Sequence, residues 1–236
     1  MKKFIIISSI IFLFIIIGYG LFQLSKSRTF QLFGGLVTNV DTTEKLVALT
    51  FDDGPGIRTN EILTILEEED VKATFYLTGS EIDEQPEAAA KIAQKGHEIG
   101  NHSYSHQRMV LKSPTFIKEE IEKTDELIRQ TGYTGEIHFR PPFGKRLLFL
   151  PYYLSQNDRK TILWDVEPET YPDIAADANK IADHVINHVK PGSIVLLHVM
   201  YESRQESIDA VREIIIGLRA EGYKVTTISE LLEYKS

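Results

Sequence analysis

The chain has 236 residues, enough for one well-buried domain or two small ones. It contains no cysteine, so disulfides, iron–sulfur clusters and thiol nucleophiles are excluded. After Arg28 the chain carries 22 Lys and Arg residues against 34 Asp and Glu, a formal charge of −12. That charge argues against nucleic-acid binding, which depends on cations that neutralise phosphates.

The first 25 residues predict a transmembrane anchor. Lys2 and Lys3 precede 22 residues without a charge, from Phe4 to Ser25. As a helix this run would be about 33 Å long, close to the thickness of a bilayer's hydrocarbon core. The alternative is a cleaved signal peptide, but that needs a shorter apolar stretch and a small-residue cleavage site such as A-x-A. We expect an uncleaved anchor at 1–25 and an exported domain, since long domains translocate largely regardless of charge.

Residues 26–44 predict a juxtamembrane segment and a β-hairpin. Residues 26–35 read as a short connection with a flexible Gly-Gly pair. Residues 37–40 and 45–51 then predict two strands around the polar turn 41–44.

The remainder, 45–236, alternates between short apolar strands and helices. Strands are expected at 46–51, 73–77, 98–101, 137–140, 161–165, 193–198 and 224–228, with helices at 59–68, from 86 to 96, from 114 to 131 and at 207–220. Strands that alternate with helices imply βαβ units and a parallel sheet. We therefore expect one α/β domain, a closed or nearly closed (β/α) barrel of about seven strands, with a doubly wound open sheet as second choice. In both folds, active-site residues gather where strands end.

Ionisable or turn-forming residues follow five of these predicted strands. Each cluster has an ordinary explanation of its own: a turn, a chance pair of surface histidines, a loop arginine or a buried histidine. Their occurrence at one rim of one fold instead predicts an active site. The clusters are Asp52-Asp53-Gly54-Pro55, His102 to His106, Arg140 to Gly144, Trp164 to Glu167, and Leu196-Leu197-His198.

Four of these clusters resemble motifs of the polysaccharide deacetylase family, which is the NodB-homology domain or carbohydrate esterase family 4. T-F-D-D-G-P stands at Thr50–Pro55, H-[ST]-x-x-H at His102–His106, R-x-P-[YF]-G at Arg140–Gly144 and L-x-H at Leu196–His198. The resemblance covers about residues 45–232 in the family's motif order. It implies a distorted barrel, usually described with seven strands, and a metal-dependent hydrolase that removes N-acetyl groups from a polysaccharide.

The resemblance also implies a metal site. Asp53, His102 and His106 would bind a divalent ion through one carboxylate and two imidazoles, which leaves positions open for water and substrate. Zn²⁺ is the first choice, and the same ligand set admits Co²⁺, Ni²⁺ or Fe²⁺.

The catalytic roles follow from the same resemblance. Asp52 would be the general base, oriented and charge-paired by Arg140, and His198 would protonate the leaving amine. The backbone N–H of Phe143 would help to stabilise the oxyanion. Candidate substrate-binding residues are Phe143, Tyr171, Leu196, which would line the acetyl pocket, and Trp164.

The fourth motif departs from the family pattern W-x-V-D-x-x-D-W, which would place Asp and Trp where this chain has Thr170 and Tyr171. In the family, that Asp pairs with the motif-five histidine and keeps it basic. A neutral threonine cannot supply the charge, so the pKa of His198 should be lower unless another carboxylate substitutes. The carboxylates near enough in sequence are Asp165, Glu167 and Glu169. Val199 also stands where an Asp is frequent.

The substrate and the cellular location are inferred from the anchor and from the lack of cysteine. An anchor and the lack of cysteine favour a bacterial envelope, where peptidoglycan is the nearest N-acetylated polymer and chitin-type oligomers come second. We expect a single-pass protein of the cell membrane with an extracytoplasmic catalytic domain and no obligate protein partner. The alternatives are an O-acetyl (xylan-type) esterase of the same family and a catalytically weak, anchored glycan-binding protein. A purely structural envelope protein would not explain the intact metal ligands.

Overall fold

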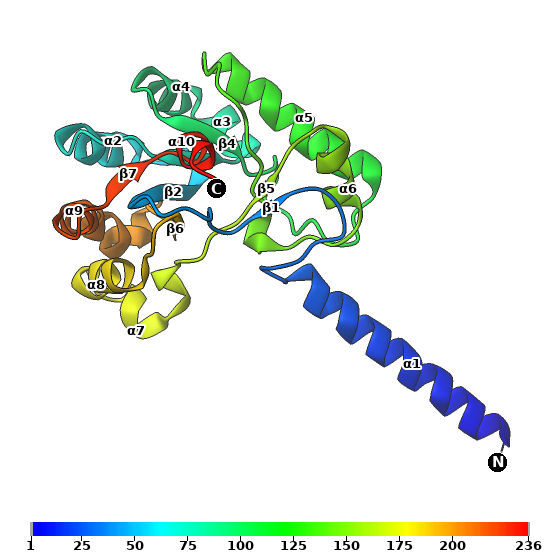
Figure 1. The fold of residues 1–236 in the computed structure, drawn as a ribbon. Helices are drawn as coiled ribbons and strands as arrows, with labels where there is room; N and C mark the ends of the chain where they lie inside the picture. Colours follow the sequence, from blue (N-terminus) through cyan, green and yellow to red (C-terminus); the bar gives the residue numbers. More distant parts are fainter. Residues whose placement is uncertain (1, 236) are drawn as a thin grey trace.

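Helix α1 (Lys2–Ser25) projects away from the rest of the chain in the computed structural model, which describes residues 2–235 (Figure 1). Its apolar side chains from Phe4 to Phe22 are exposed, and only its last residues contact the rest of the described chain. Its length and composition suit a membrane span, and a signal sequence would have the same features.

The centre of the domain is a parallel sheet built around the long, buried strand β2 (Leu46–Gly54). β2 pairs with β7 over 46–48, with β6 over 47–51 and with β3 over 50–54. The other strands are β1 (Leu36–Val37), β3 (Thr74–Leu77), β4 (Glu98–Asn101), β5 (Thr161–Ile162), β6 (Ser193–Leu197) and β7 (Lys224–Thr226). The order β4-β3-β2-β6 places the carboxyl ends of these parallel strands at one edge.

Single parallel bridges continue the pairing beyond these strands. Asn101 pairs with Phe139, Phe139 with Thr161, and Val166 with Val195. The expected strand at 137–140 is thus represented by one bridge residue, and β5 is shorter than expected. The parallel α/β sheet is confirmed, whereas closure into a barrel and the number of strands stay predictions.

The hairpin predicted within 26–44 is wrong. β1 pairs in parallel with β5 rather than antiparallel with β2, and Leu163 donates its backbone N–H to Val37 O at 2.7 Å. Val37 packs with Ile162 and Leu163 in a buried cluster. The sequence pattern showed that 37–40 was apolar but could not show which strand would cover it.

Residues 25–31 dock on the domain through Arg146, whose side chain is buried. Its backbone N–H donates to Ser25 O at 3.0 Å, and its guanidinium donates to Ser27 O at 2.7 Å and to Gln31 Oε1 at 2.9 Å. A buried guanidinium needs acceptors to offset its lost hydration. The start of the juxtamembrane segment is therefore fixed to the loop that follows Arg140.

Helices flank the sheet, with α2, α4, α8 and α9 around one side and α5 and α6 on the other (Figure 1). Helix α5 begins as predicted: the Ser113 hydroxyl accepts the Phe116 N–H at 3.2 Å, and Pro114 is its first residue. The helices are α2 (Thr59–Glu68), α3 (Gly79–Glu84), α4 (Pro86–Gln94), α5 (Pro114–Gln130), α6 (Phe149–Gln156), α7 (Pro172–Ala175), α8 (Ala178–His188), α9 (Gln205–Ala220) and α10 (Ile228–Glu233).

Candidate active site

Two adjacent carboxylates lie at the carboxyl end of β2. Asp52 is buried, and Asp53 adopts a left-handed backbone conformation with φ of 60° at an irregularity in the pairing with β3. The left-handed turn lets the neighbouring side chains face different partners. Asp52 reaches Arg140, whereas Asp53 faces a group of imidazoles.

Asp53, His102 and His106 converge on one point. Asp53 Oδ1 lies 3.1 Å from His106 Nε2 and 3.5 Å from His102 Nε2, and one donor atom of each residue lies within 4.8 Å of the others. Burial alone would raise the pKa of Asp53, but the imidazoles of His106, His102 and His198 outweigh it and hold that pKa below its usual range. The carboxylate is thus ionised and surrounded by potential ligand nitrogens.

The ring of His102 is oriented by its second nitrogen. Nδ1 lies 2.7 Å from the backbone oxygen of Arg140, which can only accept a hydrogen bond, so Nδ1 carries the proton and Nε2 presents its lone pair. Burial lowers the pKa of His102, which favours the neutral ring. A neutral imidazole held in one tautomer by a backbone carbonyl is the usual state of a metal-ligating histidine.

Glu120 of α5 supports the loop that carries the two histidines. Its buried carboxylate accepts the backbone N–H of Tyr104 at 3.0 Å and that of Ser105 at 2.8 Å, and the Ser105 hydroxyl at 2.8 Å. These bonds hold the turn in which His106 takes the left-handed conformation, φ 53°. In the sequence, Glu120 is one of several acidic residues on a predicted helix, so its role could not be distinguished from that of a solvent-exposed glutamate.

Arg140 is fully buried and holds Asp52. Its Nη1 donates to Asp52 Oδ1 at 2.6 Å and to Thr50 Oγ1 at 2.8 Å, and its Nη2 donates to Leu163 O at 3.1 Å. The guanidinium also lies 4.0 Å from the centre of the Tyr76 ring. With Oδ1 committed to Arg140, Asp52 Oδ2 is turned towards His102 Nε2, at 3.6 Å.

His198 and Glu169 form a partly buried pair on the other side of Asp53. The carboxylate of Glu169 contacts His198 Nδ1 and accepts the backbone N–H of His198 at 3.0 Å, and it also accepts the hydroxyl of Ser207. Nε2 of His198 lies 3.6 Å from Asp53 Oδ2. Burial would lower the pKa of His198, but the pairing with Glu169 outweighs it and raises this pKa to about 9.

Glu169 thus supplies the charge that Thr170 lacks. The other two nearby carboxylates are used differently: Asp165 accepts from Ser193 Oγ and from the backbone N–H of Ile194, both within 2.9 Å. Glu167 accepts from Trp164 Nε1 at 2.8 Å and from Arg28 at 3.2 Å. The sequence left these three open, and the expected lowering of the His198 pKa does not occur because one of them substitutes.

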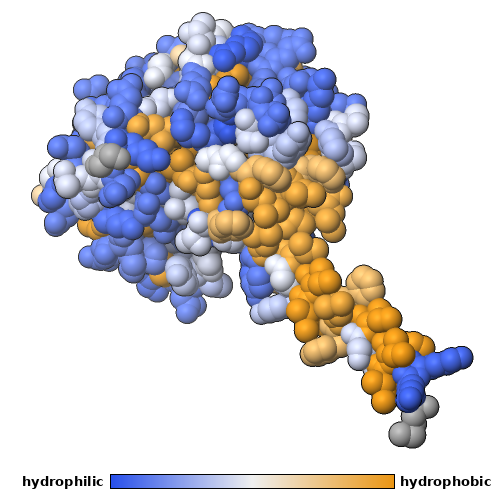
Figure 2. All heavy atoms as spheres, turned by 45° about the vertical axis from the view of Figure 1, so that its right-hand side comes forward, coloured by the Kyte–Doolittle hydropathy of each residue, from blue (hydrophilic) through white to orange (hydrophobic). Residues whose placement is uncertain are grey.

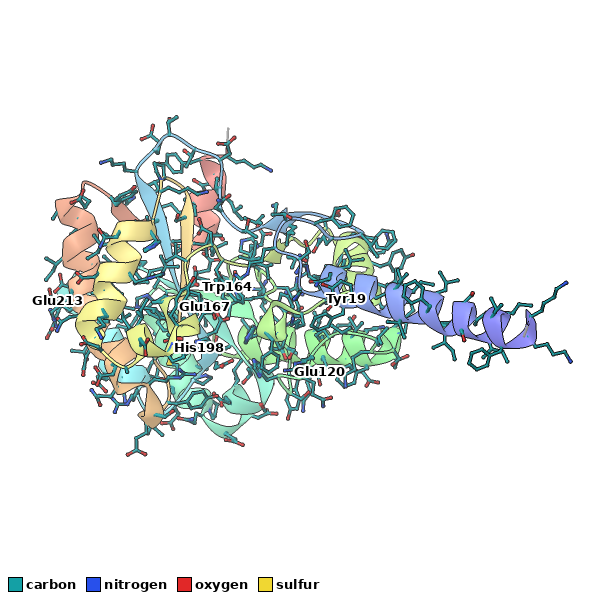
Figure 3. All side chains as sticks on the ribbon, turned by 90° about the horizontal axis from the view of Figure 1, so that it is seen from below. Tyr19, Glu120, Trp164, Glu167, His198 and Glu213 are labelled. Carbon is teal, nitrogen blue, oxygen red and sulfur yellow. The ribbon has the colours of Figure 1, made fainter. Side chains whose placement is uncertain are left out.

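The four candidate substrate-binding residues occupy different depths around the site. The exposed ring of Phe143 lies 4.8 Å from that of His106, centre to centre, and Tyr171 is also exposed. Leu196 and Trp164 are buried and pack in one cluster. Trp164 Nε1 donates to Glu167, and His198 directly follows the carboxyl end of β6; Figure 3 labels all three in the same part of the view. A cavity of about 270 Å³ is lined by Arg28, Trp164, Glu167, Thr170, Tyr171, His184 and His188, among others.

Comparison with known proteins agrees with the motifs. A family model described as "Polysaccharide deacetylase" matches residues 39–162. The peptidoglycan-N-acetylmuramic acid deacetylase PdaC of Bacillus subtilis is 36% identical over 198 residues, which cover 83% of this chain and 40% of that protein. A peptidoglycan-N-acetylglucosamine deacetylase of Bacillus cereus is 34% identical over 190 residues, covering 79% of this chain and 68% of that protein. The chain thus spans well under half of the first relative's length.

Solved structures show the same fold, and the named activities of the related proteins differ. The peptidoglycan N-acetylglucosamine deacetylase Bc1960 superposes with a TM-score of 0.78 at 30% identity, covering 84% of this chain and 94% of that one. A pseudoenzyme of the same family from Bacillus anthracis gives a TM-score of 0.75 at 30% identity, covering 84% and 69%. A bifunctional xylanase/deacetylase of Pseudobutyrivibrio xylanivorans is 33% identical over 201 residues, which cover 81% of this chain and 31% of that protein.

Proposed function

The chain belongs to the polysaccharide deacetylase family, and we propose that it removes N-acetyl groups from an extracytoplasmic glycan, with peptidoglycan the first candidate and a chitin-like glycan the second. One observation carries this proposal. Asp53, His102 and His106 converge beside Asp52, a carboxylate held by Arg140, and beside His198, a partly buried histidine of raised pKa.

The residues present fit a divalent metal. Asp53 Oδ1 is buried and accepts no hydrogen bond, although two imidazole nitrogens lie within 3.5 Å of it. Such an orphaned oxygen is costly unless a cation or a donor satisfies it. His102 presents a lone pair rather than a proton to the same point. We assign Asp53, His102 and His106 as ligands, with Zn²⁺ first and Co²⁺, Ni²⁺ or Fe²⁺ as alternatives. When bound, the ion would acidify a water and polarise the acetamide carbonyl.

Asp52 is the proposed general base. Its Oδ1 is committed to Arg140, while Oδ2 faces the metal ligands and can take a proton from the attacking water. Arg140 acts as a positioning residue, because its buried guanidinium is committed to Asp52, to Thr50 and to the backbone oxygen of Leu163.

His198 is the proposed general acid. Glu169 fixes its Nδ1, so Nε2 carries the proton that goes to the departing nitrogen on the Asp53 side of the site. With a pKa of about 9 the ring is protonated at neutral pH and can donate. The proton taken by Asp52 and the proton given by His198 balance the hydrolysis of one acetamide to acetate and an amine.

The remaining roles concern the substrate. The backbone N–H of Phe143 is assigned to the oxyanion. Gly144, with φ of 64°, follows directly, and a Cβ there would come 3.3 Å from the Trp164 ring, so a glycine suits this close approach. Tyr171 and Trp164 are assigned to the sugar, and Leu196 to the acetyl methyl group.

Helix α1 is assigned as a membrane anchor that leaves the catalytic domain outside the cytoplasm. Its 22 uncharged residues and the cell-wall polymers named for the relatives support this location. Full-length protein should then sediment with membranes and resist extraction by carbonate. A mature N-terminus near residue 26 would instead identify a cleaved signal.

Two other functions each have a supporting observation. The bifunctional xylanase/deacetylase relative favours O-acetyl ester hydrolysis, and the pseudoenzyme neighbour favours a glycan-binding role without turnover. Acetate release by the full chain from peptidoglycan, chitooligosaccharides and acetylated xylan separates all three. N-deacetylation predicts acetate from the first two, ester hydrolysis from xylan alone, and a binding role predicts none.

A further inference from the structure

The face next to α1 carries a group of exposed apolar side chains. They come from the juxtamembrane segment and from around α6, and we term them the apolar platform: Phe30, Leu32, Phe33, Leu148, Phe149 and Tyr152. Each is between 39% and 55% exposed. The Phe33 and Tyr152 rings pack edge to face at 5.4 Å, and a groove of about 370 Å³ opens beside them. Scattered apolar residues are ordinary on a surface, but a contiguous group marks an interaction site.

The platform is continuous with α1. Figure 2 shows the apolar surface of the helix running onto the adjoining face of the domain. The buried Arg146 holds Ser25, Ser27 and Gln31, so the end of the helix and the platform are tied to one loop. A bilayer that receives α1 therefore meets this face of the domain first.

The charge around the platform differs from that of the rest of the domain. The segments 26–35, 107–114 and 143–157 contain six Lys and Arg residues and no Asp or Glu. Arg146 is buried and Arg28 is paired with Glu167, so the cations at this surface are Lys26, Arg108, Lys112 and Lys145. By contrast, the chain after Arg28 carries −12. The three segments are neighbours, since Arg146 bridges to Met109 and to the residues that follow α1. Such a local excess of cations suits an anionic partner.

Two of these cations lie at the membrane end of the domain. Lys26 Nζ lies 4.7 Å and Lys145 Nζ 5.5 Å from the centre of the Phe22 ring, near the last turn of α1. Lysines above aromatic side chains at the end of an apolar helix are typical of the headgroup region.

We propose that the apolar platform is a second membrane contact, which lies in the headgroup region of an anionic bilayer while α1 spans it. The proposal rests on the membrane anchor assigned above. Exposed apolar side chains with lysines beside them, Lys26 and Lys145 near the end of α1, match the chemistry of an interfacial protein surface. A second copy of the chain fits less well, because two platforms would bring cations against cations.

This membrane contact fixes the position of the catalytic site relative to the bilayer surface. Lys145 lies near α1, and the ring of Phe143, two residues earlier, lies beside that of His106. The rim of the site is thus held next to the bilayer surface. The glycan that reaches it is the part of the polymer that lies closest to the membrane.

The test uses the absence of native cysteine. Single cysteines are introduced into the full chain by Leu32→Cys on the platform, Phe14→Cys in α1, and Glu213→Cys in α9, which lies at the opposite end of the domain (Figure 3). Each is labelled with an environment-sensitive fluorophore and reconstituted in vesicles of phosphatidylglycerol and phosphatidylcholine. Quenching by lipids that carry a spin label near the headgroup is then measured.

If the apolar platform contacts the membrane, the fluorophore at position 32 should be quenched several-fold more than the one at position 213, and its emission should shift to the blue. The difference in quenching should shrink in vesicles of phosphatidylcholine alone. Adding Leu148→Asp and Phe149→Asp should remove the difference while acetate release from a soluble chitooligosaccharide is unchanged. Equal quenching of Leu32 and Glu213 beside a quenched Phe14 overturns the platform and leaves the anchor. Quenching of Leu32 that survives both Asp substitutions also overturns it, because tethering alone would then explain the contact. An unquenched Phe14 refutes the anchor and the platform together, whereas acetate release tests the catalytic proposal separately.

Discussion

Replacing Glu169 by glutamine should move the alkaline limb of the pH–rate profile. The amide keeps the size of the side chain and can still accept from the backbone of His198 and from Ser207, but it removes the charge that faces the imidazole. Burial would lower the pKa of His198, but the charge of Glu169, together with the weaker effects of Asp52 and Asp53, outweighs burial and raises this pKa from 6.5 to about 9. The difference of about 2.5 pH units corresponds to about 3 kcal/mol between the two protonation states.

The expected effect on rate follows from the fraction of protonated acid. With a pKa of about 9, nearly every His198 carries its proton at about pH 7.5, whereas with a pKa near 6.5 roughly one in ten does. The profile of kcat/KM for N-acetylated oligosaccharide should therefore lose its alkaline limb near 9, and activity at about pH 7.5 should fall about tenfold.

Two matched controls define the result. Glu167→Gln removes a carboxylate that binds Trp164 and Arg28 instead, so its alkaline limb should stay in place. Thr170→Asp should also leave the limb in place, because Glu169 already holds His198. Coincident limbs for wild type and Glu169→Gln would refute the assignment of His198 as the acid that Glu169 tunes.

Three further predictions concern the ligands, the base and an unrelated histidine. His102→Ala should lose both metal, by elemental analysis, and acetate release; full metal occupancy would remove His102 from the ligand set. Asp52→Asn should retain metal while turnover falls about 10²–10⁴-fold, and wild-type turnover in the metal-loaded variant would place the base elsewhere. Burial lowers the pKa of His97 to about 4 against 6.5, and its Nδ1 accepts the Ala73 N–H at 3.3 Å. The unfolded chain therefore takes up this proton first as pH falls, so the free energy of unfolding should drop by about 2 kcal/mol between about pH 7 and 4.5. Urea titrations should show a smaller drop in His97→Gln, and equal drops would contradict the reasoning.

Much of the site could be predicted because its chemistry is concentrated at strand ends. Asp52 and Asp53 follow a continuous apolar strand, and His198 ends another, so parallel pairing alone brings them to one edge. The motifs predicted that His102 and His106 would join them. In the structure, the carboxylate oxygens of Asp53 lie within 3.6 Å of a nitrogen of each of the three histidines.

Other features depend on contacts that a sequence pattern does not encode. Which of three nearby carboxylates reaches His198 depends on the short turn Pro168–Thr170 between β5 and α7, and only Glu169 points inward there. The partner of β1 was missed because an apolar dipeptide fits equally well against β2 or β5. The docking of residues 25–31 depends on one buried side chain, Arg146, that is far away in the sequence.

The central claim is that Asp53, His102 and His106 hold an ion on which hydrolysis of N-acetyl groups depends. The most direct measurement is acetate release from peptidoglycan by the full-length protein, before and after removal of metal by a chelator and after return of one equivalent of Zn²⁺. Release should stop on chelation and return with stoichiometric metal, and Asp53→Ala should be inactive under all three conditions. Undiminished release from protein that elemental analysis shows to be free of metal would contradict the central claim.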